Sequence, residues 1–225
     1  LATVTDNGST SYNFGKNMDQ NYGTTAINEY AVDVSWEVAD KTNIGLDMRL
    51  LNNKLSLQVD LFKESREGIY LRRKSIPSYF GMINNPYGNI GKVENKGIEV
   101  ALNYANTWGD WSLSVMGNYS FNRNKVLEDD STAAYPWQST IGNKVGQRFG
   151  LVALGLFESK EEIAASPVQT GDTRPGDIKY KDINGDGLIN EYDEVPIGWG
   201  NVPEIIYGVG FSVGWKNLSL TAMFQ

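Results

Sequence analysis

The sequence predicts an all-β fold, part of a large antiparallel transmembrane β-barrel with about six long strands and long extracellular loops. Three observations lead to this prediction. Apolar residues recur at every second position along several stretches, the period of a strand with one apolar and one polar face. Some of these stretches are longer than the five or six residues of an ordinary strand. The connections are either tight turns or long loops, as in outer-membrane barrels.

The first predicted hairpin joins residues 44–50 to residues 55–61. Ile, Leu, Met and Leu alternate with Gly, Asp and Arg in the first stretch, and Leu, Leu, Val and Leu alternate with Ser, Gln and Asp in the second. Leu51-Asn52-Asn53-Lys54 lies between them and predicts a tight turn. The polar face includes charged groups, which the wet interior of a barrel accommodates.

The second and third hairpins follow from the same alternation. It runs over residues 98–104 and 111–122, and again over 205–215 and 218–224. The turns within these two pairs are predicted at 107–110 and 216–217. All seven prolines fall between the six predicted strands, as expected because proline removes a donor from the ladder.

The other connections are long, with about 15 residues between Arg73 and Gly88 and nearly 80 between Val126 and Pro203. The strand before the longer connection runs toward the long-loop rim, and the strand after it runs away. The whole of 127–203 is therefore predicted to be one extracellular loop region. Six strands cannot close a wide barrel, and unpaired edges are costly in lipid. We therefore expect residues 1–225 to be a fragment of one larger barrel.

Aromatic side chains provide a check on the scale of the strands. Trp111 and Phe121 lie ten residues apart on one face, which at ~3.3 Å per residue and a tilt of ~40° gives ~25 Å of height, that of the apolar band of such barrels. The two rings are predicted to lie in opposite aromatic girdles. Trp108 and Trp215, beside short turns, are expected to join Trp111 at the periplasmic interface.

Composition excludes several classes of function. The chain has no His and no Cys, which excludes Ser-His-Asp and Cys-His nucleophiles and imidazole-bound zinc. A net charge of −7 argues against nucleic acid as a partner, because phosphate binding depends on clustered Lys and Arg. No run of about 18 apolar residues is present, so no transmembrane helix is expected.

Residues 182–193, Asp-Ile-Asn-Gly-Asp-Gly-Leu-Ile-Asn-Glu-Tyr-Asp, have the spacing of a twelve-residue calcium loop. Gly187 falls where the loop needs a positive φ. Position 12 is Asp rather than Glu, which shortens its reach. The prediction is a structural Ca²⁺, and the alternative is an Asn/Asp/Gly-rich turn without an ion. The predicted ligands are Asp182, Asn184, Asp186, the carbonyl of Leu188, and Asp193.

Two groups of charged residues in or beside the loops have simpler explanations. Paired carboxylates, such as those a glycosidase uses, occur at 128–130 and at 158–162. We interpret them as solvated, and Ser159 to Glu162 as the capping box of a short helix. Arg72-Arg73-Lys74 could meet anionic lipopolysaccharide or could only end a strand with charge, and the second interpretation is favoured.

Loop aromatic residues form another candidate set. They could stack on sugar rings, or they could pack loops against one another or against a partner, which is the favoured interpretation. These residues are Tyr79, Phe80, Tyr135, Trp137 and Trp199.

Several segments resemble one family. Lys41-Thr42-Asn43-Ile44-Gly45-Leu46-Asp47, Leu51-Asn52-Asn53-Lys54-Leu55, and Asn89-Ile90-Gly91-Lys92-Val93-Glu94-Asn95-Lys96-Gly97-Ile98-Glu99 are similar to the barrel of SusC-like TonB-dependent outer-membrane transporters. Residues 176–187, Ile197-Gly198 and Gly200-Asn201-Val202-Pro203-Glu204 are similar to a run that recurs in that family. The resemblance extends from about residue 36 to the end, and the first 35 residues match weakly, as a variable loop does.

The resemblance implies a barrel of about 22 strands in the cell outer membrane. It also implies an N-terminal plug energised by TonB, a SusD-like surface lipoprotein as partner, and import of oligosaccharides or peptides. The plug, the TonB-contacting segment and most of the substrate cavity are expected to lie outside this fragment of the C-terminal half. No enzymatic step is expected.

Two other functions are considered: a secreted calcium-dependent glycan-binding or adhesion β-domain, and a glycan hydrolase that uses loop carboxylates. A soluble β-sandwich also has alternating strands. It would bury Leu57, Val59, Leu113 and Val115 in a dry core between two sheets, whereas a barrel exposes them to acyl chains.

The two faces of one strand give a test. Val59→Arg is expected to cost ~2–4 kcal/mol in a bilayer-embedded strand, because a cation then faces hydrocarbon. Gln58→Arg is the matched control and is expected to be mild, because that side chain faces water. Unfolding measured in lipid vesicles compares the two, and equal tolerance would contradict the barrel.

Overall fold

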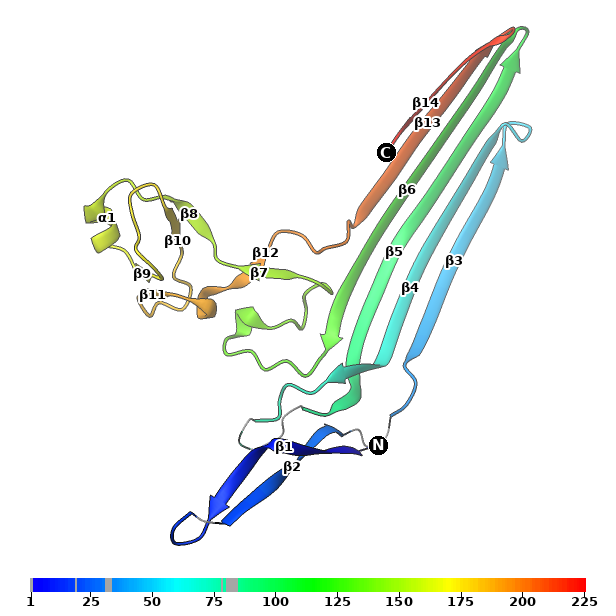
Figure 1. Ribbon diagram of the computed structural model, residues 1–225. Helices are drawn as coiled ribbons and strands as arrows, with labels where there is room; N and C mark the ends of the chain where they lie inside the picture. The colour runs from blue at the N-terminus through cyan, green and yellow to red at the C-terminus, as the bar shows by residue number, and fades with distance from the viewer. Residues whose placement is uncertain (1, 19, 31–33, 78, 80–84) are drawn as a thin grey trace.

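The protein is described by a computed structural model that covers residues 2–18, 20–30, 34–77, 79 and 85–225. Its main feature is one open six-stranded antiparallel sheet (Figure 1), in the order β14-β13-β6-β5-β4-β3. All six predicted strands are present. Their bounds are β3 Val38–Leu50, β4 Leu55–Arg72, β5 Tyr87–Trp108, β6 Trp111–Glu128, β13 Ile205–Trp215 and β14 Leu218–Phe224.

Strand pairing aligns the alternating residues across the whole sheet. One row joins Leu46, Val59, Val100, Tyr119 and Tyr207 on five neighbouring strands. Side chains alternate between the two sides of a strand, so this row and every second row beside it share one side. We call the side that carries Val59 the apolar face and the side that carries Gln58 the polar face.

No second sheet covers the apolar face. In the described part of the chain, the buried apolar side chains are Phe157 and Ile189, and neither belongs to the six-stranded sheet. Leu57, Val59 and Leu113 are all partly exposed. A dry core between two stacked sheets, as in a soluble sandwich, is therefore not formed.

The two ends of the sheet differ, as predicted. The three short turns lie together at one end, and the long connections lie at the other (Figure 1). The first turn uses positive φ angles of 54°, 55° and 66° at Leu51, Asn52 and Asn53, and the amide N–H of Lys54 donates to the carbonyl of Leu51. The second turn is tighter than predicted, because β5 continues to Trp108 and leaves only Gly109 and Asp110 between the strands.

Strands β4, β5 and β6 are longer than their apolar alternation indicates. Beyond Leu61, pairing continues through Lys63–Lys96 and Glu67–Lys92 to Arg72. Backbone pairing does not need apolar side chains, so the ladder persists where the sequence period fades. Close packing also helps to hold these strands: a Cβ at Gly97 would lie 2.2 Å from the carbonyl oxygen of Phe121 and 2.6 Å from the ring of Phe62.

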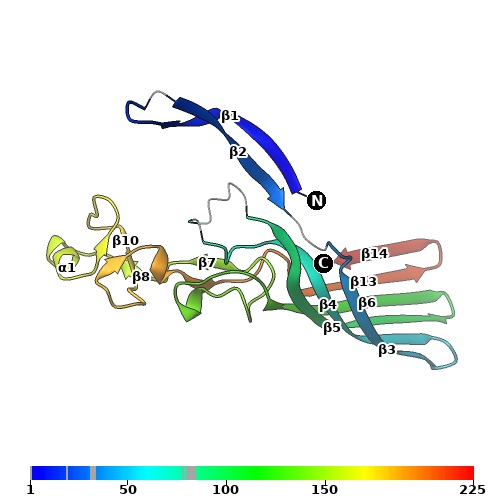
Figure 2. The same cartoon turned by 90° about the horizontal axis from the view of Figure 1, so that it is seen from below.

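Residues at the N-terminal end form a hairpin that the sequence did not indicate. Strands β1 Ala2–Phe14 and β2 Gln20–Tyr30 pair with each other. They are not part of the six-stranded sheet. The hairpin lies beyond the long-loop end of that sheet (Figures 1 and 2).

The connection between β6 and β13 spans residues 129–204, and we call it the loop unit. It leaves the long-loop end of the sheet and projects away from it (Figure 2). Two antiparallel pairs, β8–β10 and β7–β12, and one parallel pair, β9–β11, hold it. Its elements are η2 Pro136–Gln138, β7 Arg148–Gly150, β8 Ala153–Leu156, α1 Lys160–Ala164, β9 Val168–Gln169, β10 Ile178–Tyr180, β11 Leu188–Ile189, η3 Glu191–Asp193 and β12 Val195–Ile197.

The predicted cap of the short helix is confirmed in part. The Ser159 side chain accepts from the N–H of Glu162 at the start of α1, but the Glu162 side chain accepts from the N–H of Glu158 and not from that of Ser159. Pro196 lies between the six predicted strands, as predicted, although the loop there forms the short strand β12. Among the described residues, no helix is long and apolar enough to span a bilayer.

Candidate functional site

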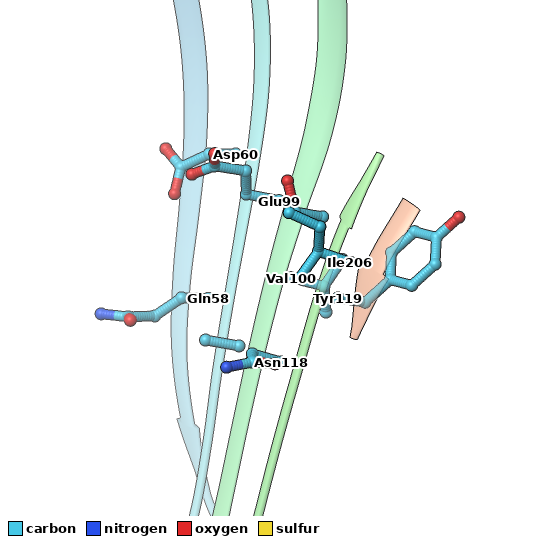
Figure 3. A pocket seen from close by; sticks show the side chains of 9 residues that line it. Gln58, Asp60, Glu99, Val100, Asn118, Tyr119 and Ile206 are labelled. Atoms are coloured by element: carbon cyan, nitrogen blue, oxygen red, sulfur yellow. The ribbon is translucent and has the colours of Figure 1, made fainter. Parts of the chain in front are cut away.

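The polar face of the sheet is a candidate ligand surface. Gln58, Asp60, Glu99 and Asn118 point to this side, whereas Tyr119 points to the other (Figure 3). Together with short neighbouring side chains they line a shallow groove of about 310 Å³. Asp60 and Glu99 are direct cross-strand neighbours, so the groove is acidic as well as rich in hydrogen-bonding groups.

Nearer the long-loop end, the polar face has a balanced ion network. Lys41 lies 3.5 Å from Glu64, and Arg66 lies 2.8 Å from Glu64 and 2.9 Å from Glu37. The two positive charges of Lys41 and Arg66 are thus balanced by the two negative charges of Glu37 and Glu64.

Tryptophan rings gather at the short-turn end of the apolar face. Trp108 pairs with Trp111, and Trp111 pairs with Trp215. The ring centroids of Trp111 and Trp215 are 6.0 Å apart. All three residues are at least 42% exposed, so the described part of the chain leaves much of their surface open. Amphipathic rings placed in this way suit a membrane–water interface.

The loop at 182–193 is preformed by bonds from its own side chains. The two carboxylate oxygens of Asp182 accept from the N–H groups of Gly185 and Gly187, at 2.7 and 2.9 Å. Asn184 and Asp186 each accept from the N–H two residues later. Gly187 has the predicted positive φ, 82°. Leu188 begins β11, which leaves the loop.

Asp193, at the last position of this loop, is fully buried. Its carboxylate accepts from the N–H groups of Ile183, Asn184 and Asn190. Burial tends to raise the pKa of Asp193, but these N–H groups and the side chain of Asp182 hold it below its usual value. The Asp193 side chain therefore ties the two ends of the loop together.

The five predicted ligands lie in one short segment of the loop unit. Within the described part of the chain, no three Asp, Glu, His or Cys side chains form a group that could hold a metal ion. The donor set is nonetheless made only of oxygens, which are the ligands that calcium prefers.

Two of the predicted loop aromatics pack against the exit of this loop. Tyr135 stacks on Trp137 with centroids 4.6 Å apart and meets Tyr192 edge-on at 5.8 Å. The indole N–H of Trp137 donates to the carbonyl of Tyr192. Trp199 is 70% exposed, with the Lys144 ammonium 4.2 Å from its ring centroid. Tyr79 is exposed, and Phe80 lies outside the described residues.

Several loop carboxylates accept hydrogen bonds from other parts of the loops. Asp129 accepts from Ser131 and Thr140, and Asp130 accepts from the N–H groups of Lys74 and Ser75. Glu162 accepts from the N–H of Glu158 and pairs with Lys179 at 2.8 Å. These bonds give Asp129, Asp130 and Glu162 structural roles in the loops.

Glu204, just before β13, is a site that the sequence did not reveal. Its two carboxylate oxygens accept from Arg123 at 2.9 and 3.0 Å, and Lys144 lies 2.9 Å away. The Arg123 guanidinium, followed by the Lys144 ammonium, lowers the pKa of Glu204 from 4.5 to about 2. Glu204, at the C-terminal end of the loop unit, therefore joins Arg123 of β6 to Lys144 in the first part of that unit. The only sequence signal for this residue was its place in the family-like segment Gly200-Asn201-Val202-Pro203-Glu204.

The sequence of this chain matches a known protein family over most of its length. The family described as "TonB dependent receptor-like, beta-barrel" matches residues 4–222. The chain belongs to this family. The match begins at residue 4, so the N-terminal hairpin falls within it, contrary to the expected start near residue 36. TonB-dependent receptors are outer-membrane β-barrel proteins and not enzymes, and the sheet is therefore part of an outer-membrane barrel.

Individual relatives agree with this assignment. TonB-dependent receptor P3 of Formosa agariphila is 27% identical, over 92% of this chain and 22% of the relative. TonB-dependent receptor SusC of Bacteroides thetaiotaomicron is 21% identical, over 97% of this chain and 22% of the relative. The RagAB peptide importer in its open-open state shares the fold, with a TM-score of 0.71 and 19% identity over 99% of this chain and 23% of the importer chain. The chain spans about a fifth of the length of these TonB-dependent receptors.

Glu204 gives a prediction with a defined pH dependence. Its pKa is lowered on folding, so its stabilising contribution is complete above about 4.5 and is lost as the pH falls toward about 2. Pepsin should therefore cleave the loop unit faster as the pH falls through this range. Compared with the parent at the same pH, Glu204→Gln should be cleaved severalfold faster at the upper end of this range, and the difference between the two proteins should shrink toward a pH of about 2. Glu161→Gln is the control and should behave as the parent, and an identical profile for Glu204→Gln would contradict this role.

Proposed function

We propose that the chain forms part of the C-terminal half of the barrel of a TonB-dependent importer, in which the polar face lines the path of the substrate. The observation that carries this proposal is the register that keeps apolar residues on one side of six strands and polar residues on the other. A barrel with lipid outside and water inside needs this separation. The long-loop end then faces the cell exterior, and residues 129–204 form an extracellular region.

The substrate is proposed to be an oligosaccharide or a peptide. The relatives named SusC and RagAB peptide importer support these two classes. The groove at Gln58 and Asn118 offers amide groups that can bond either one. The chain itself catalyses no reaction in this proposal, which its membership of a receptor family supports.

A surface protein, of the SusD-like lipoprotein class, is proposed to cover the loop unit, and TonB to act through a plug supplied by another part of the protein. Exposed apolar side chains on the loop unit support a protein partner. Leu156 and Ile178 are cross-strand neighbours and are 60% and 43% exposed, and Val168 and Leu188 are neighbours at 65% and 50%. Single exposed apolar residues are common, but adjacent pairs form a surface that a partner can bury.

Calcium is proposed to bind the loop at 182–193 through the oxygens of Asp182, Asn184, Asp186 and Asp193 and the carbonyl of Leu188. The all-oxygen donor set and the bend at Gly187, whose φ is 82°, support it, because calcium takes oxygen ligands from a loop that turns sharply at this position. Calcium would supply charge neutralisation there. The carbonyl of Tyr192 in the same loop accepts from the indole N–H of Trp137. Bound calcium would therefore also stiffen the packed rings of Tyr135, Trp137 and Tyr192.

The transport proposal is tested in the full-length protein by substitutions on two faces of one strand. Gln58→Trp should narrow the substrate path and lower uptake of the imported oligosaccharide or peptide severalfold at equal surface expression. Val59→Trp places the same ring against lipid and should import normally. Normal uptake by Gln58→Trp, or an equal loss in both variants, would contradict the assignment of the polar face.

The calcium proposal is tested by calorimetry on the full-length protein. Asp186→Ala removes one ligand charge and should weaken calcium binding by about tenfold or more. It should also increase proteolysis within residues 170–200. Asp172→Ala removes an exposed carboxylate outside the loop and should bind as the parent does. Unchanged calcium binding by Asp186→Ala would exclude the site.

A further inference from the structure

The apolar face ends, toward the long loops, in a row of three basic residues. Lys63 pairs with Lys96, and Lys96 pairs with Arg123, and we call these three residues the basic row. They lie two residues beyond Leu61, Ile98 and Phe121 on the same strands, and therefore on the same face. The basic row thus borders the apolar band directly.

Positive charge is in excess around this row. Glu94 is shared by Lys63 at 2.7 Å and Lys96 at 3.9 Å. Glu204 is likewise shared by Arg123 and Lys144. Two carboxylates therefore serve four cations. The next row outward, with Asp40, Ser65, Glu94 and Lys125, carries charges of both signs.

The polar face at the same height is different. There Lys41 and Arg66 meet Glu37 and Glu64, one carboxylate for each cation. On the face that meets lipid, Lys63 and Lys96 thus share one carboxylate, whereas on the polar face Lys41 and Arg66 have two. The side chains of Lys63, Lys96 and Arg123 are 59%, 64% and 50% exposed, so they are accessible to a ligand.

Like charges on directly opposed residues destabilise a sheet, and the two carboxylates leave two of the four positive charges uncompensated, so an external anion would stabilise the row. The height of the row indicates which one. Two residues of rise at a tilt of ~40° place it ~5 Å beyond the last apolar row. This is the depth of the headgroups of lipids whose acyl chains contact the apolar band.

We propose that the basic row binds the phosphate groups of an anionic lipid, whose acyl chains lie along the apolar face at Leu61, Ile98 and Phe121. Lys63 and Lys96 supply point charges, and Arg123 is held by its two bonds to Glu204. The Arg123 guanidinium also lies 5.3 Å from the centroid of the Phe121 ring. That ring would then mark the boundary between the acyl chains and the phosphate.

The experiment uses the full-length protein in phosphatidylcholine nanodiscs, titrated with fluorescent lipid A, a lipid that carries two phosphate groups. Each lysine near a charged lipid surface changes affinity by about fivefold, so Lys63→Gln/Lys96→Gln should weaken lipid A binding by about 30-fold. Lys96→Gln alone should weaken it by about fivefold, which keeps the test available if the double variant does not fold. Lys63→Arg/Lys96→Arg should bind as the parent.

Lys41→Gln removes the same charge from the polar face and is the matched control, with unchanged binding expected. Equal binding by the parent and the double variant would overturn the proposal, as would an equal loss in Lys41→Gln. Binding of dephosphorylated lipid A with undiminished affinity would exclude phosphate as the recognised group. Competition by inorganic phosphate as effective as that of lipid A would exclude the lipid as the occupant. The lipid measurement does not depend on transport, because lipid A binding is measured in nanodiscs and substrate uptake in a separate experiment. Failure of this proposal is therefore distinguishable from failure of the transport proposal.

Discussion

The structure depends on one constraint: each backbone N–H and C=O group that lies in lipid must find its partner in a neighbouring strand. The continuous pairing from β3 to β14 meets this constraint, and it also fixes the side to which each residue points. A slip of one residue in the pairing of β4 would move Val59 and the other apolar residues of that strand to the opposite face. The aligned register therefore does more than hold strands together, because it separates a surface for lipid from a surface for water.

The two ends of the sheet show how this separation is bounded. Exposed tryptophans lie at the short-turn end, and charged cross-strand pairs continue the strands at the other. Bonds to carboxylates hold the loop unit, whose apolar core is small. Asp193 is buried with three N–H partners, and Glu204 joins Arg123 to Lys144. A segment that projects beyond the membrane can in this way keep a defined shape without a large hydrophobic core.

Much of this organisation follows from local patterns. Period-two alternation identified all six strands because lipid and water select opposite residue types on the two faces. The Ser159 cap and the bend at Gly187 were predicted because their causes lie within a few residues, although the return bond of the predicted capping box goes to Glu158. The β1–β2 hairpin was missed because its segment lacks that alternation. The outer parts of β4, β5 and β6 were missed because charged pairs replaced the apolar residues there.

The sequence by itself determined which residues share a face, where the tight turns fall, and that residues 182–193 form a bend rich in oxygen ligands, since each depends on neighbours in the chain. Only the tertiary structure decided which distant charges meet. Arg123 and Glu204 are separated by 81 residues, and Lys63, Lys96 and Arg123 become a row only through the register of three strands. Such encounters depend on pairing between strands, which no local period encodes.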